Sequence, residues 1–220
     1  MKNKVYTPVD DLAVTYYILV GESPVNTASV MVTNNLFERY NISKEVLHEK
    51  AFENMHISYP AKVESIVEQL VKVLPPEETE VMRNEVPLYV VSNEKGMNGA
   101  VEILDPHTMD LIKETLGNQE YLAIPSSVHE FLIMPMDESG SFREMAAMIQ
   151  MVNQTAVSKE EILSDHPYKI DPERHLFISA DKDIAVEKEM ENKNIEQKQL
   201  DIMMQPNVHE RKIEQRGPRL

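Results

Sequence analysis

The chain has 220 residues, of which 42% are hydrophobic and 27% are charged, and it contains no cysteine. This composition is ordinary for a globular protein with a substantial core, and the lack of cysteine excludes disulfides, thiolate nucleophiles and cysteine-ligated metal centres. The formal net charge of −15 opposes binding to phosphate backbones and anionic lipids, so we expect neither direct nucleic-acid binding nor membrane association. The N-terminus lacks the apolar segment of a signal peptide, and a cytoplasmic location is the corresponding expectation.

The first third of the chain predicts a β-hairpin followed by two helices. Apolar residues alternate over 12–20, and after a turn-forming segment 28–34 is typical of the returning strand. Ser43 is placed to cap a helix over 44–55, whose apolar residues recur every fourth position. The segment 61–74 has the apolar stripe of a second helix.

The middle of the chain contains the clearest local signal. An acidic, proline-led stretch over 75–85 leads to a predicted strand over 86–93. Asp105 then stands as a helix N-cap before a proline, and Gly117 stands just past the last apolar position. This pattern predicts a helix over 106–116.

The remaining elements alternate strands and helices. Two apolar strands are expected at 120–124 and 129–135, followed by a serine-capped helix over 142–154. A short helix is expected over 158–163, and 167–179 predicts a strand–turn–strand unit.

This order of elements predicts an α+β fold, in which a mostly antiparallel sheet packs with helices. We expect a single domain over 1–180. The mixed charge and sparse apolar residues of 181–220 predict a charged tail that is helical or disordered.

The segment PSSVHE places four chemically capable side chains within five positions: Ser126, Ser127, His129 and Glu130. In an extended chain His129 would share a face with Phe131 and point toward the core. Ser127 lies too close to His129 along such a chain for the usual nucleophile–base pair. The favoured interpretation is a bend between two strands, in which the hydroxyls satisfy backbone groups. A polar ligand-binding patch and a catalytic cluster are the alternatives.

The segment SNEKGMNGA, residues 92–100, has two glycines but neither of the common phosphate-loop patterns. It predicts a turn in which Asn98 or Gly99 takes a positive φ. The histidines form no local metal motif such as HExxH. A site assembled from His129 with His166 or His175 is the remaining possibility, and we expect no metal, no cofactor and no assigned catalytic residue.

Several segments together resemble a family of uncharacterised bacterial proteins that is catalogued only as a domain of unknown function. The resemblance covers about residues 10–172, and its most specific parts are Asn93 with Gly99 and Ala100, PSSVHE, and LSDHPY at 163–168. It implies a cytosolic bacterial protein, sometimes encoded near mobile elements, and no established reaction or partner. The candidates for ligand or partner binding are therefore Asn93, Gly99, Ser126, Ser127, His129, Glu130, Asp165, His166 and Tyr168.

Three functions remain open. The favoured hypothesis is a non-enzymatic protein-binding or scaffold module that recognises another protein, for example a basic one, through its acidic body or its PSSVHE surface. The first alternative is an acidic nucleic-acid mimic that acts as an inhibitor encoded by a mobile element. The second is a hydrolase that uses Ser127, His129 and Glu130, with help from Asp165 or His166.

Overall fold

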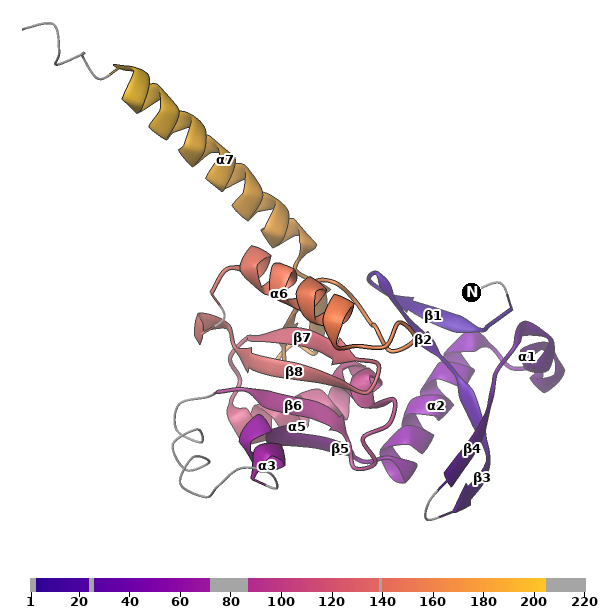
Figure 1. The fold of residues 1–220 in the computed structure, drawn as a ribbon. Coiled ribbons are helices and arrows are strands. Elements are labelled where there is room, and N and C mark those ends of the chain that lie inside the picture. The colour runs from indigo at the N-terminus through magenta and orange to yellow at the C-terminus, as the bar shows by residue number, and fades with distance from the viewer. Residues whose placement is uncertain (1–2, 24–25, 72–86, 139, 205–220) are drawn as a thin grey trace, which may run out of the picture.

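The computed structural model of the protein describes residues 3–23, 26–71, 87–138 and 140–204. At its centre is a six-stranded sheet with the strand order β10-β9-β7-β8-β6-β5, and all five neighbouring pairs are antiparallel. Helices cover both faces of this sheet (Figure 1). The predicted α+β class is therefore confirmed. The strands are β5 (Ala61–Ser65), β6 (Tyr89–Asn93), β7 (Tyr121–Ser127), β8 (Glu130–Pro135), β9 (Tyr168–Asp171) and β10 (Leu176–Ser179).

One face of the sheet carries the larger core. The short helix η1 (Gly99–Leu104) and the helix α5 (Pro106–Leu116) pack there. Successive side chains of a strand point to opposite faces, so Tyr121 and Ala123 meet these helices while Leu122 lies on the other face. The buried side chains of the larger core are Val91, Ala100, Ile103, Met109, Ile112, Tyr121, Ala123, Phe131, Ile133, Tyr168 and Ile170.

The helix α5 forms as its sequence predicts. The Asp105 side chain accepts a hydrogen bond from the backbone N–H of His107, at 3.1 Å. Gly117, just past the helix, has a φ of 106°, a conformation that glycine adopts without steric cost. On the opposite face the helix α6 (Phe142–Thr155) begins at Ser141 and packs on Leu122.

The segments 3–23 and 26–59, called here the N-terminal unit, stand beside the sheet (Figure 1). The hairpin predicted over 12–34 is present as β3–β4, but Tyr16 divides its first strand because the preceding residues pair with β1. Ser43 caps the predicted helix α2. The sequence did not predict β1 or α1. The elements of the unit are β1 (Tyr6–Val9), β2 (Leu12–Thr15), β3 (Tyr17–Ser23), β4 (Asn26–Met31), α1 (Asn34–Tyr40) and α2 (Lys44–Ser58).

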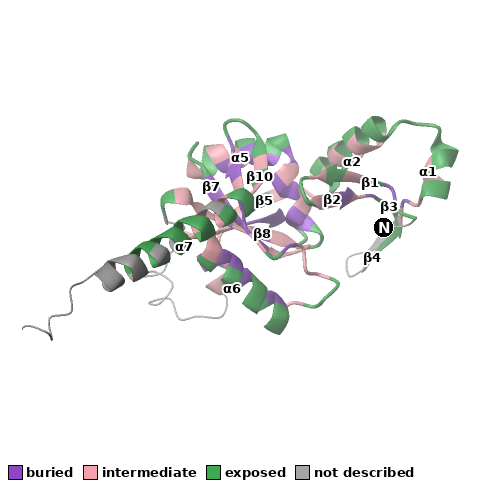
Figure 2. Cartoon of the chain, turned by 90° about the horizontal axis from the view of Figure 1, so that it is seen from above, coloured by how far each residue is buried: buried purple, intermediate pink, exposed green. Residues whose placement is uncertain are grey.

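The N-terminal unit has a small core of its own. Val5, Val14, Tyr16 and Val32 are buried together, and residues of η1 pack against them. Neither α1 nor α2 contains a buried residue, and both are largely green and pink in Figure 2, in contrast to the purple of the central strands. The two helices are therefore attached to the body through half-buried contacts.

Of two further predicted helices, the one over 61–74 is shortened and the one over 158–163 is absent. The segment 61–74 begins instead with β5, in which Val63 lies opposite Val91 of β6, and Ser65 then caps the short helix α3 (Ile66–Leu70). Cross-strand pairing outweighs the helical periodicity there, since propensity is a weak local preference. The acidic stretch expected over 75–85 lies outside the described residues.

The helix predicted over 158–163 is reduced to a turn. The backbone N–H groups of Glu161 and Ile162 both donate to the carbonyl of Ser158. The Glu161 carbonyl accepts from the backbone of Val128, at 2.9 Å, so it is used by a neighbouring segment and does not continue a helix.

The helix α7 (Asp181–Met204) extends away from the body (Figures 1 and 2). Glu187 anchors its first turns, because its carboxylate accepts hydrogen bonds from the Ser141 hydroxyl and from the backbone of Phe142 and Arg143, at 2.8, 3.1 and 3.0 Å. Burial alone would raise the pKa of Glu187, but these hydrogen bonds outweigh it and lower the pKa. None of the described helices combines the length and the apolar character needed to cross a bilayer.

Glu102 of η1 is a buried acid with incomplete pairing. Its residue exposure is 0%, and the Thr108 hydroxyl donates to Oε2 at 3.4 Å. Among the described residues Oε1 has no hydrogen-bond partner. Burial, with a smaller contribution from the nearby charge of Asp105, raises the pKa of Glu102 from 4.5 to about 7.

This raised pKa predicts a stability that falls with pH. Between about 4.5 and 7 the folded state holds more protons than the unfolded state, so the free energy of unfolding should drop across that range by up to about 3 kcal/mol and then level off. Glu102→Gln should remove this loss and be the more stable protein at about pH 8. Urea unfolding at several pH values measures this. Glu114→Gln, on the exposed side of α5, is the control, and a Glu102→Gln profile parallel to wild type would contradict the prediction.

Candidate functional site: a groove beside the central sheet

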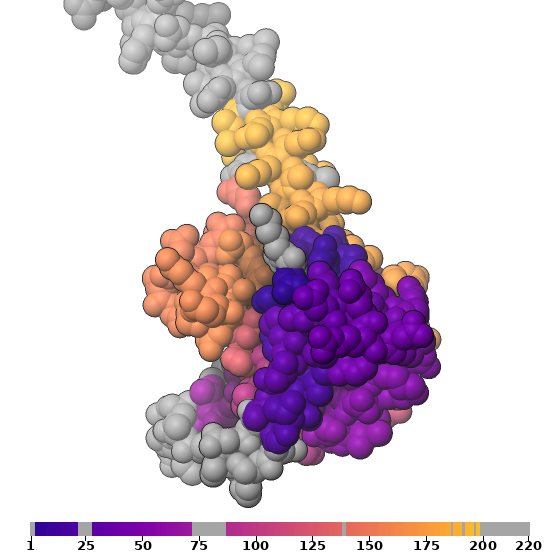
Figure 3. All heavy atoms as spheres, turned by 90° about the vertical axis from the view of Figure 1, so that its right-hand side faces the viewer, coloured from indigo at the N-terminus to yellow at the C-terminus, as the bar shows by residue number. Residues whose placement is uncertain are grey.

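A groove of about 850 Å³ lies between the N-terminal unit and the central sheet. One wall comes from β2, β3 and α2, and the other from residues 93–104 with side chains of the sheet core. Figure 3 shows the N-terminal unit, in indigo and purple, from its outer side. A groove of this size between two packed parts of a chain is a usual place for binding sites.

The groove is mainly apolar, with a polar edge. Phe131, Leu163 and Phe177 line it from the central body, and Asn93 and Asn98 add amide groups at one side. Its apolar surface continues outward onto side chains that water reaches. These rim residues, with their exposed fractions, are Tyr17 (50%), Leu19 (43%), Tyr40 (47%) and Ile42 (40%).

Asn93 shapes the loop at the polar edge of the groove. Its Nδ2 donates to the Met97 carbonyl at 2.9 Å, and its Oδ1 accepts from the backbone of Lys95 at 3.1 Å and of Met97 at 3.4 Å. Gly96 and Asn98 have φ values of 63° and 52°. The predicted turn, with a positive φ at Asn98, is therefore confirmed, and Asn93 organises it from within.

This loop is fastened to the turn between β7 and β8. The backbone N–H of Asn98 donates to Nδ1 of His129 at 3.0 Å, and the Ser92 hydroxyl donates to the His129 carbonyl at 2.8 Å. The N–H of Ala100 donates to the Val128 carbonyl at 3.3 Å. Two of the three family-like motifs, Asn93–Ala100 and PSSVHE, therefore meet in space.

The hydrogen bonds of the His129 ring indicate a structural role for this side chain. Its Nδ1 accepts a hydrogen bond, so the neutral ring carries its proton on Nε2, which faces Oε1 of Glu161 at 3.4 Å. Neither nitrogen then offers a lone pair to a nucleophile. The expectation that His129 faces the core is wrong, because its side chain is 33% exposed; it lies in the turn, where strand alternation does not apply.

The serines of PSSVHE satisfy local groups. The Ser127 hydroxyl accepts from the backbone N–H of His129 at 3.1 Å, and the Ser126 hydroxyl donates to Glu130 at 3.1 Å. Among the described residues no hydrogen bond joins the Ser127 hydroxyl to the His129 ring. A turn between two strands is confirmed, but it lies at Val128 and His129, because β7 continues through the serines to Ser127 with a register shift after Pro125.

The third motif, LSDHPY, does not join this contact. It binds the tip of the β1–β2 hairpin. His166 Nε2 and the Tyr168 hydroxyl both donate to the carboxylate of Asp11, at 2.9 and 2.8 Å. Burial opposes a charge on His166, but its hydrogen bonds to the Pro167 carbonyl and to Asp11 outweigh it and raise its pKa. Asp165 accepts from the Asn153 amide at 2.9 Å. His166 and Tyr168 therefore hold the N-terminal unit to the sheet, whereas Asp165 joins the motif to α6.

One group in the described part of the chain has the composition of a metal site. His56, Asp105 and His107 each supply one ligand atom, and the three atoms lie within 4.8 Å of one another. The sequence analysis missed this group, because His56 is separated from the DPH run by 48 intervening residues and no spacing rule connects them. Only the fold brings α2 and α5 together.

A comparison with models of known protein families identifies the family of this chain. Residues 1–171 match the family described as "Family of unknown function (DUF5688)". The chain belongs to this family. The match includes the N-terminal unit and the strands through β9, and it ends before β10 and α7. No curated protein and no solved structure matches the chain. The resemblance to a family of unknown function is thus confirmed, and membership in DUF5688 carries no activity with it.

Gly99 is required at the contact between the two motifs. A Cβ built there would overlap the Ser92 hydroxyl and would lie 2.7 Å from the backbone nitrogen of Asn93 and 2.8 Å from the His129 carbonyl. Gly99→Ala should therefore lower the free energy of unfolding by about 1–3 kcal/mol. Urea unfolding measures the loss. Gly21→Ala is the control, since nothing lies within 4 Å of its added carbon, and equal effects of the two substitutions would contradict this role.

Proposed function

We propose that this DUF5688 chain is a non-enzymatic protein-binding module, and that its groove receives an apolar segment of another protein. The observation that supports this most directly is the rim, where Tyr17, Leu19, Tyr40 and Ile42 extend the apolar groove onto the surface. Contiguous exposed apolar surface next to a concave site is typical of protein interfaces. An occupant that covers both groove and rim must be larger than most small ligands.

The charge of the chain favours a partner with basic residues beside its apolar segment. The net charge is −15, which attracts such a partner over distances near the Debye length and weakens with salt. A cytoplasmic location and a bacterial source, sometimes near mobile elements, stay predictions from the sequence. The nucleic-acid mimic stays the alternative that uses the same charge.

The hydrolase alternative has less support from the geometry. A catalytic histidine needs a free nitrogen directed at its nucleophile, whereas Nδ1 of His129 accepts from the backbone of Asn98. Ser127 uses its oxygen to accept from the His129 backbone. These hydrogen bonds favour a role of the PSSVHE side chains in shaping the turn.

Single-cysteine crosslinking tests the proposal, because the natural chain has no cysteine and an introduced thiol can be labelled selectively. Ile42→Cys places a photoreactive label on the rim, and Met151→Cys places one on α6, at a side chain that is 60% exposed. In lysate of the source organism, Ile42→Cys should crosslink one or a few proteins that Met151→Cys does not. Mass spectrometry identifies them.

Substitution of the rim completes the test. Leu19→Asp should reduce the crosslinked yield about tenfold, as expected for a buried contact at the centre of an interface, while Met151→Asp should not. A yield that falls with ionic strength supports the basic partner. Equal crosslinking from both positions, or a small apolar molecule that co-purifies with the chain in place of any crosslinked protein, would contradict the proposal.

A further inference from the structure

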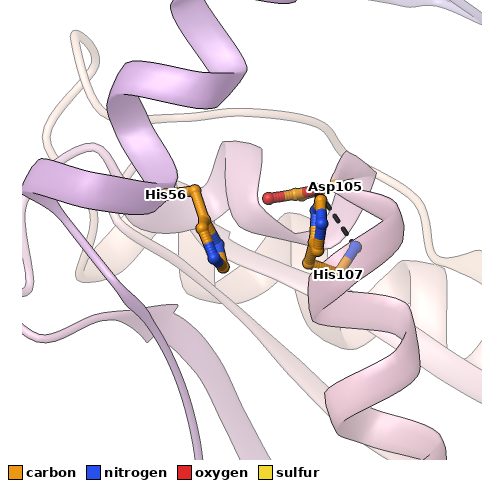
Figure 4. Close-up of side chains that lie close together, drawn as sticks. All are labelled: His56, Asp105 and His107. Atoms are coloured by element: carbon orange, nitrogen blue, oxygen red, sulfur yellow. Dashed lines mark hydrogen bonds and ion pairs between the residues drawn. The ribbon is translucent and has the colours of Figure 1, made fainter.

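The last turn of α2 and the first turn of α5 bring two imidazoles and a carboxylate together (Figure 4). His56 comes from α2, Asp105 is the N-cap of α5, and His107 follows within that helix. The centroids of the two rings are 4.7 Å apart. Nδ1 of His107 lies 3.1 Å from Oδ1 of Asp105. The three side chains face one another across the junction of the two helices.

The geometry is close to that of a divalent metal site. The three ligand atoms lie within 4.8 Å of one another, whereas donors about 2.0–2.2 Å from a tetrahedral ion are roughly 3.4 Å apart. The most distant pair of these atoms must therefore approach by up to about 1.4 Å. His56 is exposed and the His107 side chain is 71% exposed, so both rings can rotate at little cost, while the buried Asp105 stays fixed.

The charge at this junction also favours a cation. The side chain of Asp105 is only 4% exposed, and the buried carboxyl of Glu102 comes three residues before it in the chain. Among the described residues no lysine or arginine forms an ion pair with either acid. The imidazole of His107, 3.1 Å from Asp105, is a cationic partner only when it is protonated, and a buried carboxylate without such a partner is costly. The dipole at the start of α5 disfavours a cation, but by far less than metal coordination supplies.

We infer that His56, Asp105 and His107 bind a divalent transition-metal ion of the zinc class and thereby tie α2 to α5. Two imidazoles with one carboxylate suit Zn²⁺, Co²⁺ or Ni²⁺, whereas Mg²⁺ and Ca²⁺ prefer sites made of oxygen donors. Three protein ligands leave a coordination position for water.

Such an ion would fix one end of the groove. His56 directly follows Met55 of the α2 wall, and Asp105 directly follows Leu104 of the facing wall. Because α2 contains no buried residue, a bond across this junction adds a constraint that the apolar contacts do not provide. The inference concerns the metal alone and does not depend on what the groove binds.

Calorimetric titration of the untagged full chain with Zn²⁺ tests the site. One equivalent should bind, and His56→Ala and His107→Ala should each weaken the affinity at least tenfold. Asp105→Asn should weaken it too while keeping α5 capped, since asparagine caps as well as aspartate. Bound Co²⁺ should give the visible absorption of a nitrogen and oxygen ligand set, and each variant should lose it.

The matched control is His175→Ala. His175 also pairs with a carboxylate, Asp110, at 2.9 Å, but that pair supplies only two ligand groups. Its removal should leave Zn²⁺ affinity unchanged. Hydrogen exchange should show that Zn²⁺ protects the last turn of α2, and His107→Ala should abolish this protection. Binding that survives in both histidine variants, equal loss in His175→Ala, or no binding of Zn²⁺ to the wild type would overturn the inference.

Discussion

The structure depends on the close approach of one loop to one turn at Gly99. Only a residue without a Cβ leaves room there for the Ser92 side chain and for the backbone of Asn93 and His129. This approach allows three hydrogen bonds between the loop and the β7–β8 turn, and these fix where η1 begins. From η1, Val101 and Leu104 reach the core of the N-terminal unit, so the position of one wall of the groove follows from the same contact.

The elements that the sequence predicts well are those whose signals are local. Asp105 and Gly117 mark the two ends of α5, because helix capping depends on interactions between a few neighbouring residues. The positive φ of Asn98 likewise depends on local geometry. The segment 61–74 could not be predicted this way, because its first residues become a strand only through pairing with β6. The groove has no sequence signature either, since its walls come from residues more than 100 positions apart, from Leu12 to Phe177.

The motifs that characterise the sequence serve mainly to hold parts of the fold together. Asn93 and His129 fasten the loop to the sheet, and His166 and Tyr168 fasten the hairpin tip through Asp11. Polar groups suit this task because hydrogen bonds have direction, and their loss in a half-buried setting leaves costly unpaired atoms. Chemically capable residues were therefore a poor guide to the groove, whose apolar side chains carry no motif.

The N-terminal unit is attached to the sheet by the polar contacts of Asp11 with His166 and Tyr168, yet its two helices bury no residue fully. Such a part of a protein opens locally at lower free energy than the central strands do. Anything that binds both walls of the groove, whether an apolar segment or an ion at the α2–α5 junction, loses part of its binding free energy in suppressing that opening. Two ligands that suppress the same motion must help each other, because each removes an entropic cost that the other would otherwise meet. The weak packing of α2 thus gives the chain a physical means of coupling the groove to the junction beside it.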